Sequence, residues 1–226
     1  MRQKDNSLDF LVAERLYRGF SGLLYVRIHP QLENSPWRKT ESRDLPFEIL
    51  EIGAGSGEHF RHVKQNFSRY YMLDVSDFGY QKVKLITLTN PSCKFVLGSA
   101  ESLPFQKESI DHIVATCVLA HLERPEMALR ELRRVLKTKG TASVFVSADP
   151  SLFLRMMRKL FVSRKMSDLP ISYELYNRIA HINPVHQLLH LIKKVFKEDE
   201  IKVIYYPFRL PIWNLSTHVI VHLRKR

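Results

Sequence analysis

Three glycines alternate along the chain, beginning two residues after an acidic side chain. Glu51 is followed by Gly53, Gly55 and Gly57. An apolar run precedes them and a helical pattern begins at Glu58, which predicts a strand, a tight turn and a helix N-terminus. Such a turn lets a ligand approach the backbone, and a helix N-terminus offers N–H groups to an anion. A dinucleotide fingerprint would need glycine at position 58, so the spacing disfavours NAD.

A second acidic residue ends the next apolar run. Asp74 lies in the predicted strand 69–75, 21 residues beyond Gly53. Nucleotide-binding α/β folds place a carboxylate near this distance, where it accepts two hydrogen bonds from the ribose hydroxyls. The sequence therefore predicts that Asp74 binds a ribose, and the alternative is a solvated loop aspartate.

One cysteine and several histidines are candidates for chemistry further along the chain. No neighbour in sequence would lower the pKa of Cys117, so it is interpreted as a pocket-lining residue and not as a nucleophile. His121 is either structural or faces a substrate. His186 and His190 have helical spacing, but no third ligand is evident, so no metal site is predicted.

These residues need a scaffold, and the apolar pattern supplies one. Strands are expected at 48–52, 69–75, 93–97, 110–122 and 141–148, and helices from 58, over 78–88 and over 125–137. Strands that alternate with helices predict a doubly wound, mostly parallel α/β sheet. Two further strand patterns lie at 201–206 and 217–223.

Three of these segments resemble the motifs of class I S-adenosylmethionine (SAM) dependent methyltransferases of the type 11-like family. Residues 51–57 resemble motif I, 98–105 resemble G-D-A-E-x-L-P-F, and 110–122 resemble F-D-x-V-x-x-x-x-V-L-x-H-L. The resemblance implies a Rossmann-like, doubly wound seven-stranded sheet with six parallel strands and one antiparallel strand. It also implies N-terminal helices and a helical lid insertion between strands 5 and 6.

The resemblance implies SAM as the cofactor, held by residues carried over from the family's motifs. Ser99 stands where the family usually has Asp and would accept a hydrogen bond from the adenine amino group more weakly. The expected cofactor-binding residues are Glu51, Gly53, Ala54, Gly55, Gly57, Asp74, Val75, Ser99, Ala100, Glu101, Thr116 and Cys117.

The resemblance implies a division of the chain into four parts, of which charge distinguishes one. The predicted parts are an N-terminal helical cap (1–47), a SAM-binding core (48–150), a basic helical lid (151–197) and the last two core strands (198–226). The net charge is +12, and residues 151–197 carry nine Lys/Arg against two Asp/Glu. This basic segment is interpreted as a lid, and a contact with an anionic membrane surface is the alternative.

The lid also contains the residues expected to face the methyl acceptor. Methyltransferases of this class commonly carry a polar His/Asn element before the helix that precedes strand six, and residues 181–186 match it. His181 is the first candidate for a catalytic base, followed by His121, and Tyr17, Asn183 and His186 are predicted to bind the substrate.

The function expected from these observations is methyl transfer to a small molecule, at a hydroxyl or amine of a sugar, sugar-nucleotide or lipid-linked glycan. A basic lid suits an anionic or phosphate-bearing acceptor. The alternatives are an RNA methyltransferase and a non-catalytic binding protein of this fold. Two cysteines without C-x-x-C spacing, and no apolar run of about 18 residues, predict a cytoplasmic location. The membrane-associated alternative rests on the basic insertion.

Overall fold

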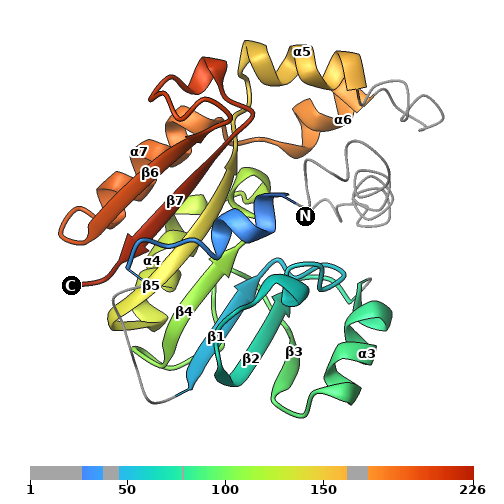
Figure 1. Ribbon diagram of the computed structural model, residues 1–226, viewed down its shortest axis with the longest axis vertical. Helices are drawn as coiled ribbons and strands as arrows, with labels where there is room; N and C mark the ends of the chain where they lie inside the picture. Colours follow the sequence, from blue (N-terminus) through green and yellow to red (C-terminus); the bar gives the residue numbers. More distant parts are fainter. Residues whose placement is uncertain (1–26, 38–45, 78, 162–172) are drawn as a thin grey trace.

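The computed structural model describes residues 27–37, 46–77, 79–161 and 173–226, and a seven-stranded sheet lies at its centre (Figure 1). The strands are β1 (Phe47–Ile52), β2 (Phe67–Asp74), β3 (Cys93–Leu97), β4 (Ile110–Ala115), β5 (Leu136–Ser147), β6 (Glu200–Tyr206) and β7 (His218–Arg224). Their order is β3-β2-β1-β4-β5-β7-β6. Since only β7 runs against its neighbours, the predicted sheet of six parallel strands and one antiparallel strand is confirmed.

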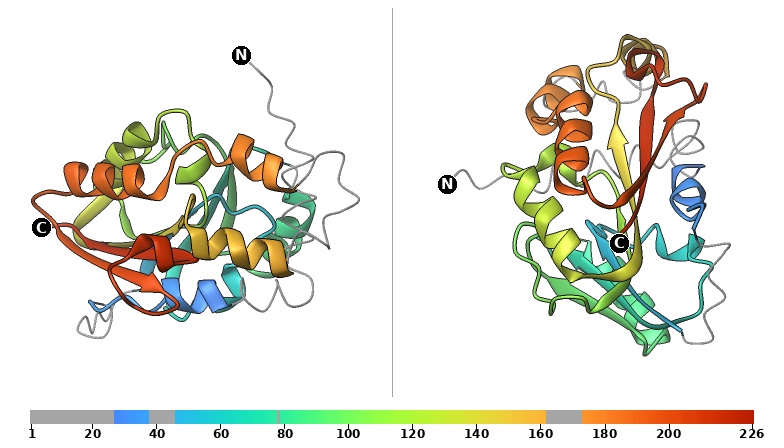
Figure 2. Two further views of the ribbon diagram at one scale, coloured as in Figure 1. Left: turned by 90° about the horizontal axis from the view of Figure 1, so that it is seen from above. Right: turned by 90° about the vertical axis from the view of Figure 1, so that its left-hand side faces the viewer.

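Helices cover both faces of this sheet. They are α3 (Tyr80–Thr89), α4 (Pro125–Val135), α5 (Leu152–Phe161), α6 (Tyr173–Ala180) and α7 (Val185–Val195). Short 3-10 helices are η1 (Phe60–His62), η2 (Leu119–His121) and η4 (Trp213–Leu215). Figure 2 shows α4 and α7 on one face of the sheet and a helical segment within residues 27–32 on the other.

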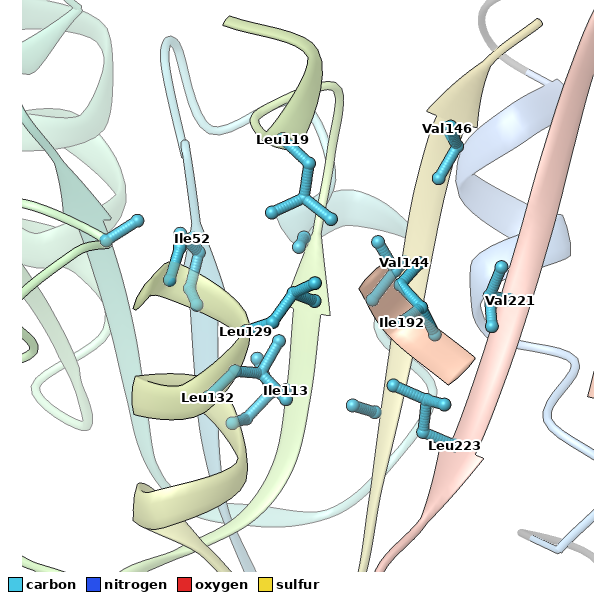
Figure 3. Close-up of a cluster of buried hydrophobic side chains, with 14 of the residues drawn as sticks. Ile52, Ile113, Leu119, Leu129, Leu132, Val144, Val146, Ile192, Val221 and Leu223 are labelled. Carbon is cyan, nitrogen blue, oxygen red and sulfur yellow. The ribbon is translucent and has the colours of Figure 1, made fainter. Parts of the chain in front are cut away.

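The larger core lies between the sheet and the helices α4 and α7 (Figure 3). Successive residues of a strand point to opposite faces, so every second residue of the central strands enters this core. Ile52, Ile113 and Val144 come from β1, β4 and β5, and each is at most 3% exposed. They pack with Leu129 of α4 and Ile192 of α7, and this packing fixes the ends of the three strands relative to one another.

Helix α7 belongs to this core, although the sequence analysis placed residues 151–197 in a lid. Val185, Leu188 and Ile192 are at most 1% exposed, and α7 lies against α4. The other two helices described in that segment, α5 and α6, contribute no residue to the larger core cluster. Of the predicted cap, only residues 27–37 and the last residues before β1 are described.

The helix expected to begin at Glu58 does not form. Turns lead instead into η1, with i,i+3 hydrogen bonds from the Phe60 amide to the Gly57 carbonyl and from the His62 amide to the His59 carbonyl. Only nine residues separate Gly57 from the start of β2, and short helices gain little stability of their own. The buried imidazole of His59 is also tied to Glu33 at 3.0 Å, which holds this segment against residues 27–37.

Candidate active site

The glycine turn adopts the backbone that its sequence suggested. Gly53, Gly55 and Gly57 all have positive φ, at 75°, 51° and 76°. A Cβ atom at Gly53 would lie 2.1 Å from a methyl carbon of Val118, so no larger residue fits there. A Cβ atom at Gly55 would meet no atom within 4 Å. The turn is therefore packed at its first glycine and open at its second.

Asp74 connects the end of β2 to this open part of the turn. Its Oδ2 atom accepts a hydrogen bond from the Gly55 amide at 2.9 Å, and its Oδ1 atom accepts one from the Ser76 amide at 3.0 Å. A carboxylate has about four acceptor positions, so two are left for a ligand diol. Next to it, Val75 is 71% exposed.

Glu51 supports the turn from inside the protein. Its carboxylate is 1% exposed and accepts a hydrogen bond from the Tyr70 hydroxyl at 2.8 Å. Burial raises the pKa of Glu51 to about 7, although His59 and the Tyr70 hydrogen bond oppose the shift. Glu51 thus ties the end of β1 to Tyr70 of β2.

The segment that resembles the adenine-flanking motif forms a tight turn. The Ser99 hydroxyl accepts a hydrogen bond from the Glu101 amide at 3.1 Å, and Ala100 is buried. The carboxylate of Glu101 binds Arg124 through the guanidinium and the backbone amide, both at 2.9 Å. Glu101 therefore already has a structural partner, whereas the Ser99 hydroxyl hydrogen is still available to a ligand.

The residues after β4 lie beside the first glycine. The Thr116 hydroxyl donates to the Gly53 carbonyl at 3.3 Å, and Cys117 follows with a φ of 55°. Because β1, β2 and β4 are parallel neighbours, their carboxyl ends meet at one edge of the sheet. Expected cofactor residues from three separate segments are thus gathered at that edge.

Three side chains that could do chemistry meet next to this edge. Cys117 Sγ lies 3.8 Å from Nε2 of His121, which ends η2. The rings of His121 and His181 are 4.8 Å apart and nearly perpendicular. One ligand atom from each of the three side chains lies within 4.8 Å of the other two. The two candidate catalytic histidines therefore share one site with Cys117.

A carboxylate after β5 holds His181 in place. Nδ1 of His181 lies 2.6 Å from Oδ2 of Asp149. The same carboxylate accepts hydrogen bonds from the Ser147 hydroxyl at 2.6 Å and from Arg158 Nη2 at 2.9 Å, and Arg158 Nη1 pairs with its other oxygen. Arg158 comes from α5, so the predicted lid contributes both Arg158 and His181 to the site.

These contacts change the ionisation of all three groups. Burial opposes charge on Asp149, but His181 and Arg158 outweigh it and hold the pKa of Asp149 well below its usual range. Burial likewise lowers the pKa of His181, but hydrogen bonds with Asp149 and Cys117 outweigh this effect and raise the pKa to about 9. Burial raises the pKa of Cys117, yet its bonds with His121 and His181 lower it to about 6.

Two interpretations from the sequence change as a result. Cys117 was expected to have an ordinary thiol because no neighbour in sequence would activate it, but His121, only four residues later, and His181, from across the fold, both lower its pKa. His181 was expected to be a base. Without a metal ion its imidazole is protonated at neutral pH, so it would donate a proton there and not accept one.

Comparisons with known proteins agree with this geometry. A family profile described as a methyltransferase domain matches residues 50–144. The chain is 24% identical over 188 residues to the biotin biosynthesis bifunctional protein BioHC of Teredinibacter turnerae, covering 78% of this chain and 30% of that protein. It is 26% identical over 153 residues to the malonyl-(acyl-carrier protein) O-methyltransferase of Halalkalibacterium halodurans, covering 65% of this chain and 56% of that protein.

A solved structure extends the likeness beyond the matched domain. It is a SAM-dependent methyltransferase of Thermotoga maritima, described as a possible histamine N-methyltransferase. Its TM-score is 0.57 at 19% identity, over 96% of this chain and 100% of that one. Residues 50–144 of this chain thus match a methyltransferase domain, and the chain shares the fold of a SAM-dependent methyltransferase. It spans about half, or less, of the length of the two curated relatives named above.

The three residues predicted to bind the methyl acceptor have different outcomes. Asn183 is buried, and its amide donates to the carbonyls of Leu119 and Leu122 at 3.0 and 2.6 Å. Asn183 therefore holds η2 in place, and its amide hydrogens are not free for a substrate. His186 is exposed, with its ring 5.9 Å from that of Trp213. Tyr17 lies outside the described residues.

Asp149 and Arg158 were not among the site residues expected from the sequence. Asp149 comes just after β5, at the same edge of the parallel sheet as Asp74. A carboxylate after a parallel strand is a signal that could have identified it. Arg158 carried no comparable signal, because it was one of several basic residues in an amphipathic pattern.

Proposed function

We propose that the protein transfers the methyl group of SAM to a small-molecule acceptor. The observation that carries this proposal is the meeting of the glycine turn, Asp74 and the Cys117–His121–His181 cluster at one edge of the sheet. In the reaction the bond between sulfur and the methyl carbon breaks while the bond to the acceptor atom forms. S-adenosylhomocysteine leaves, and the acceptor loses a proton.

The turn and the end of β2 would hold the cofactor. The open side of Gly55 lets a ligand approach the backbone, and the remaining acceptor positions of Asp74 suit the ribose hydroxyls. Ser99 and Ala100 would contact the adenine, and Thr116 and Cys117 the methionine part, as the family resemblance implies. When bound, SAM supplies an electrophilic methyl group, so the protein's main task is to align the two reactants.

The cluster would receive the reacting atom of the acceptor. Cys117 lies one residue from Thr116, which contacts the glycine turn, so the cluster is adjacent to the expected methyl-donor end. Since His181 already carries a proton, the acceptor's proton would pass to the pair of Cys117 and His121.

We propose a narrower class of acceptor atom than the hydroxyl or amine expected from the sequence. Neither curated relative named above is described as acting on a sugar or glycan, and one is described as a malonyl-(acyl-carrier protein) O-methyltransferase. We propose an acceptor that reacts through a hydroxyl or carboxyl oxygen. Sugar, sugar-nucleotide and lipid-linked glycan hydroxyls remain a predicted subclass, with phosphate groups that the basic segment could bind.

The test is turnover of SAM with a panel of acceptors. The panel contains carboxylic acids, phenols, sugars, sugar nucleotides and amines, and S-adenosylhomocysteine formation is measured for each. We expect turnover with at least one oxygen acceptor and none without acceptor. Turnover with amines alone would contradict the oxygen proposal, and turnover with RNA alone would support the nucleic-acid alternative. A folded protein that binds SAM but turns over with none of these would contradict the enzymatic proposal.

Contact with a membrane surface is proposed separately for α5. Leu152, Met156 and Leu160 recur every four residues on this helix and are 50% to 64% exposed. Lys159 is exposed beside them, whereas Arg158 is paired with Asp149. No helix among the described residues is long and apolar enough to cross a membrane. Sedimentation with anionic vesicles tests the contact, which we expect to be lost in a Leu152→Gln, Leu160→Gln double variant.

A further inference from the structure

The cluster at the end of β4 has the composition of a metal site. Cys117, His121 and His181 offer one thiolate and two imidazoles. They come from three places in the chain: the residues after β4, the end of η2 and the residue after α6. No other group of three such side chains is found among the described residues.

The distances suit a tetrahedral ion such as Zn²⁺. Zinc binds sulfur at about 2.3 Å and imidazole nitrogen at about 2.0–2.1 Å, so neighbouring ligand atoms lie roughly 3.3–3.6 Å apart in a tetrahedron. Cys117 Sγ and His121 Nε2 are already 3.8 Å apart. All three ligand atoms lie within 4.8 Å of one another, so side-chain shifts of about an ångström would complete the geometry.

The surroundings of His181 match those of a metal-bound histidine. Such a histidine usually gives its second ring nitrogen to a carboxylate, which fixes the tautomer and the ring orientation. Asp149 occupies Nδ1 of His181 at 2.6 Å, which leaves Nε2 for Cys117 or a metal. Ser147 and Arg158 hold Asp149 in turn, so the carboxylate cannot easily turn away.

The same groups could form a thiolate–imidazolium pair with no metal. That arrangement needs one histidine oriented by one carboxylate, as His181 is by Asp149. A pair of this kind gives no role to His121, whose Nε2 atom also points at the sulfur of Cys117. Two imidazoles that converge on one thiolate are better explained by a shared ion.

We propose that Cys117, His121 and His181 bind one divalent transition-metal ion, with zinc preferred, and leave a fourth coordination position open. Three protein ligands with one open position are typical of catalytic zinc sites. The open position would take the acceptor oxygen, and a hydroxyl bound there would lose its proton to solvent before methyl transfer. With the ion bound, Cys117 and His121 would be ligands and would not take that proton. This role in the reaction rests on the proposed function, whereas metal binding does not.

The experiment measures metal binding directly, with no turnover. Full-length protein is stripped with chelator and titrated with Co²⁺, which reports thiolate ligation through a charge-transfer band and tetrahedral geometry through its visible absorption. Zn²⁺ is then titrated against a chromophoric chelator. We expect one equivalent of each metal per chain and a thiolate band that Zn²⁺ removes.

Variants identify the ligands. Cys117→Ser, His121→Gln and His181→Gln should each weaken Zn²⁺ binding by at least 100-fold, and Asp149→Asn by about 10- to 100-fold. Cys93→Ala and His186→Gln are matched controls, because Cys93 lies in β3 and His186 contacts Trp213, and neither should change binding. Circular dichroism and thermal unfolding of each stripped variant show whether it is folded.

The outcomes separate the metal site from the methyltransferase activity. Absence of the thiolate band, binding below one equivalent, or affinities unchanged by all three ligand variants would overturn the metal site. Rapid alkylation of Cys117 in a protein that binds no metal would indicate the thiolate–imidazolium pair instead. Metal binding without SAM binding would leave the site intact and contradict the proposed function. SAM turnover that is unaffected by complete metal removal would contradict the role of the ion in the reaction.

Discussion

Nδ1 of His181 lies 2.6 Å from Oδ2 of Asp149, and this contact joins the chain after α6 to the end of β5. Arg158 of α5 completes the arrangement from a third element. The two helices outside the core are thus anchored to the sheet through one carboxylate. The site is therefore assembled only in the folded protein, from residues 117 to 181.

Arg158→Met should destabilise the protein. The side chains of Arg158 and Asp149 are 14% and 17% exposed, so loss of the cation leaves a largely buried carboxylate with less compensation. Removing one partner of a buried pair costs about 3–5 kcal/mol, and we expect about 3 kcal/mol in urea unfolding because His181 still contacts Asp149. Lys159→Met is the control on the same helix, because Lys159 is exposed, and it should change stability by less than about 0.5 kcal/mol. Equal effects of the two variants would contradict the anchoring role.

The cluster shows what the sequence could and could not predict. Apolar runs identified the positions of all seven strands, because a buried strand leaves a strong local pattern. Two bounds were wrong: β4 ends at Ala115 and not at 122, and β5 begins at Leu136 and not at 141. Asp149 lies 32 residues after Cys117, and His181 lies 32 residues after Asp149. Only the strand order brings these three residues together. The effect of His181 on Cys117 therefore could not be inferred from the sequence, whereas His121 lies only four residues after Cys117 and was overlooked as its partner.

Local rules were wrong where tertiary contacts prevailed. The helix at Glu58 was expected from its pattern, but the short connection and the buried His59 favour turns and η1. Asn183 was expected to bind a substrate because residues 181–186 match a polar His/Asn element of the family, but its amide donates to the backbone carbonyls of Leu119 and Leu122, in η2 and just after it. A polar side chain bonded to distant backbone leaves no periodic signal in the sequence.

Gly53→Ala should be more harmful than Gly55→Ala. Both residues have positive φ, which costs a residue with a Cβ about 1–2 kcal/mol. At Gly53 the new Cβ would also lie 2.1 Å from Val118, whereas at Gly55 it would meet open space. We expect losses of about 3 kcal/mol or more and about 1–2 kcal/mol in urea unfolding. Similar losses at both positions would show that Val118 does not constrain the turn.

Glu51→Gln should alter the pH dependence of stability. The pKa of Glu51 rises from 4.5 in the unfolded chain to about 7 in the folded protein, chiefly through burial. Its favourable contribution is present below pH 4.5 and is lost as the pH rises through 7. Glutamine keeps an acceptor for Tyr70 without this loss, so relative to wild type the variant should gain up to about 3 kcal/mol between pH 4 and pH 8. A stability difference that does not vary with pH would refute this assignment.

Asn183→Ala should destabilise the protein by removing the hydrogen bonds that hold η2 in place. Its amide satisfies the carbonyls of Leu119 and Leu122, and loss of a buried hydrogen-bond partner costs about 1–3 kcal/mol. Because His121 ends η2, the variant should also weaken Co²⁺ binding while leaving the thiolate band. His186→Ala is the matched control on the exposed start of α7 and should change neither quantity. Unchanged stability in Asn183→Ala would return this residue to the candidates for substrate binding.

Calorimetric titration of the full-length protein with SAM, beside Asp74→Asn, tests the central claim most directly. Asparagine at 74 can still accept the Gly55 hydrogen bond but has lost the charge and acceptor capacity expected to hold the ribose. We predict saturable binding at one site per chain for the wild type and at least a tenfold weaker affinity for the variant, with unchanged thermal unfolding in the absence of SAM. A folded wild-type protein that binds no SAM, or binds it equally well after the substitution, would contradict the cofactor site described above.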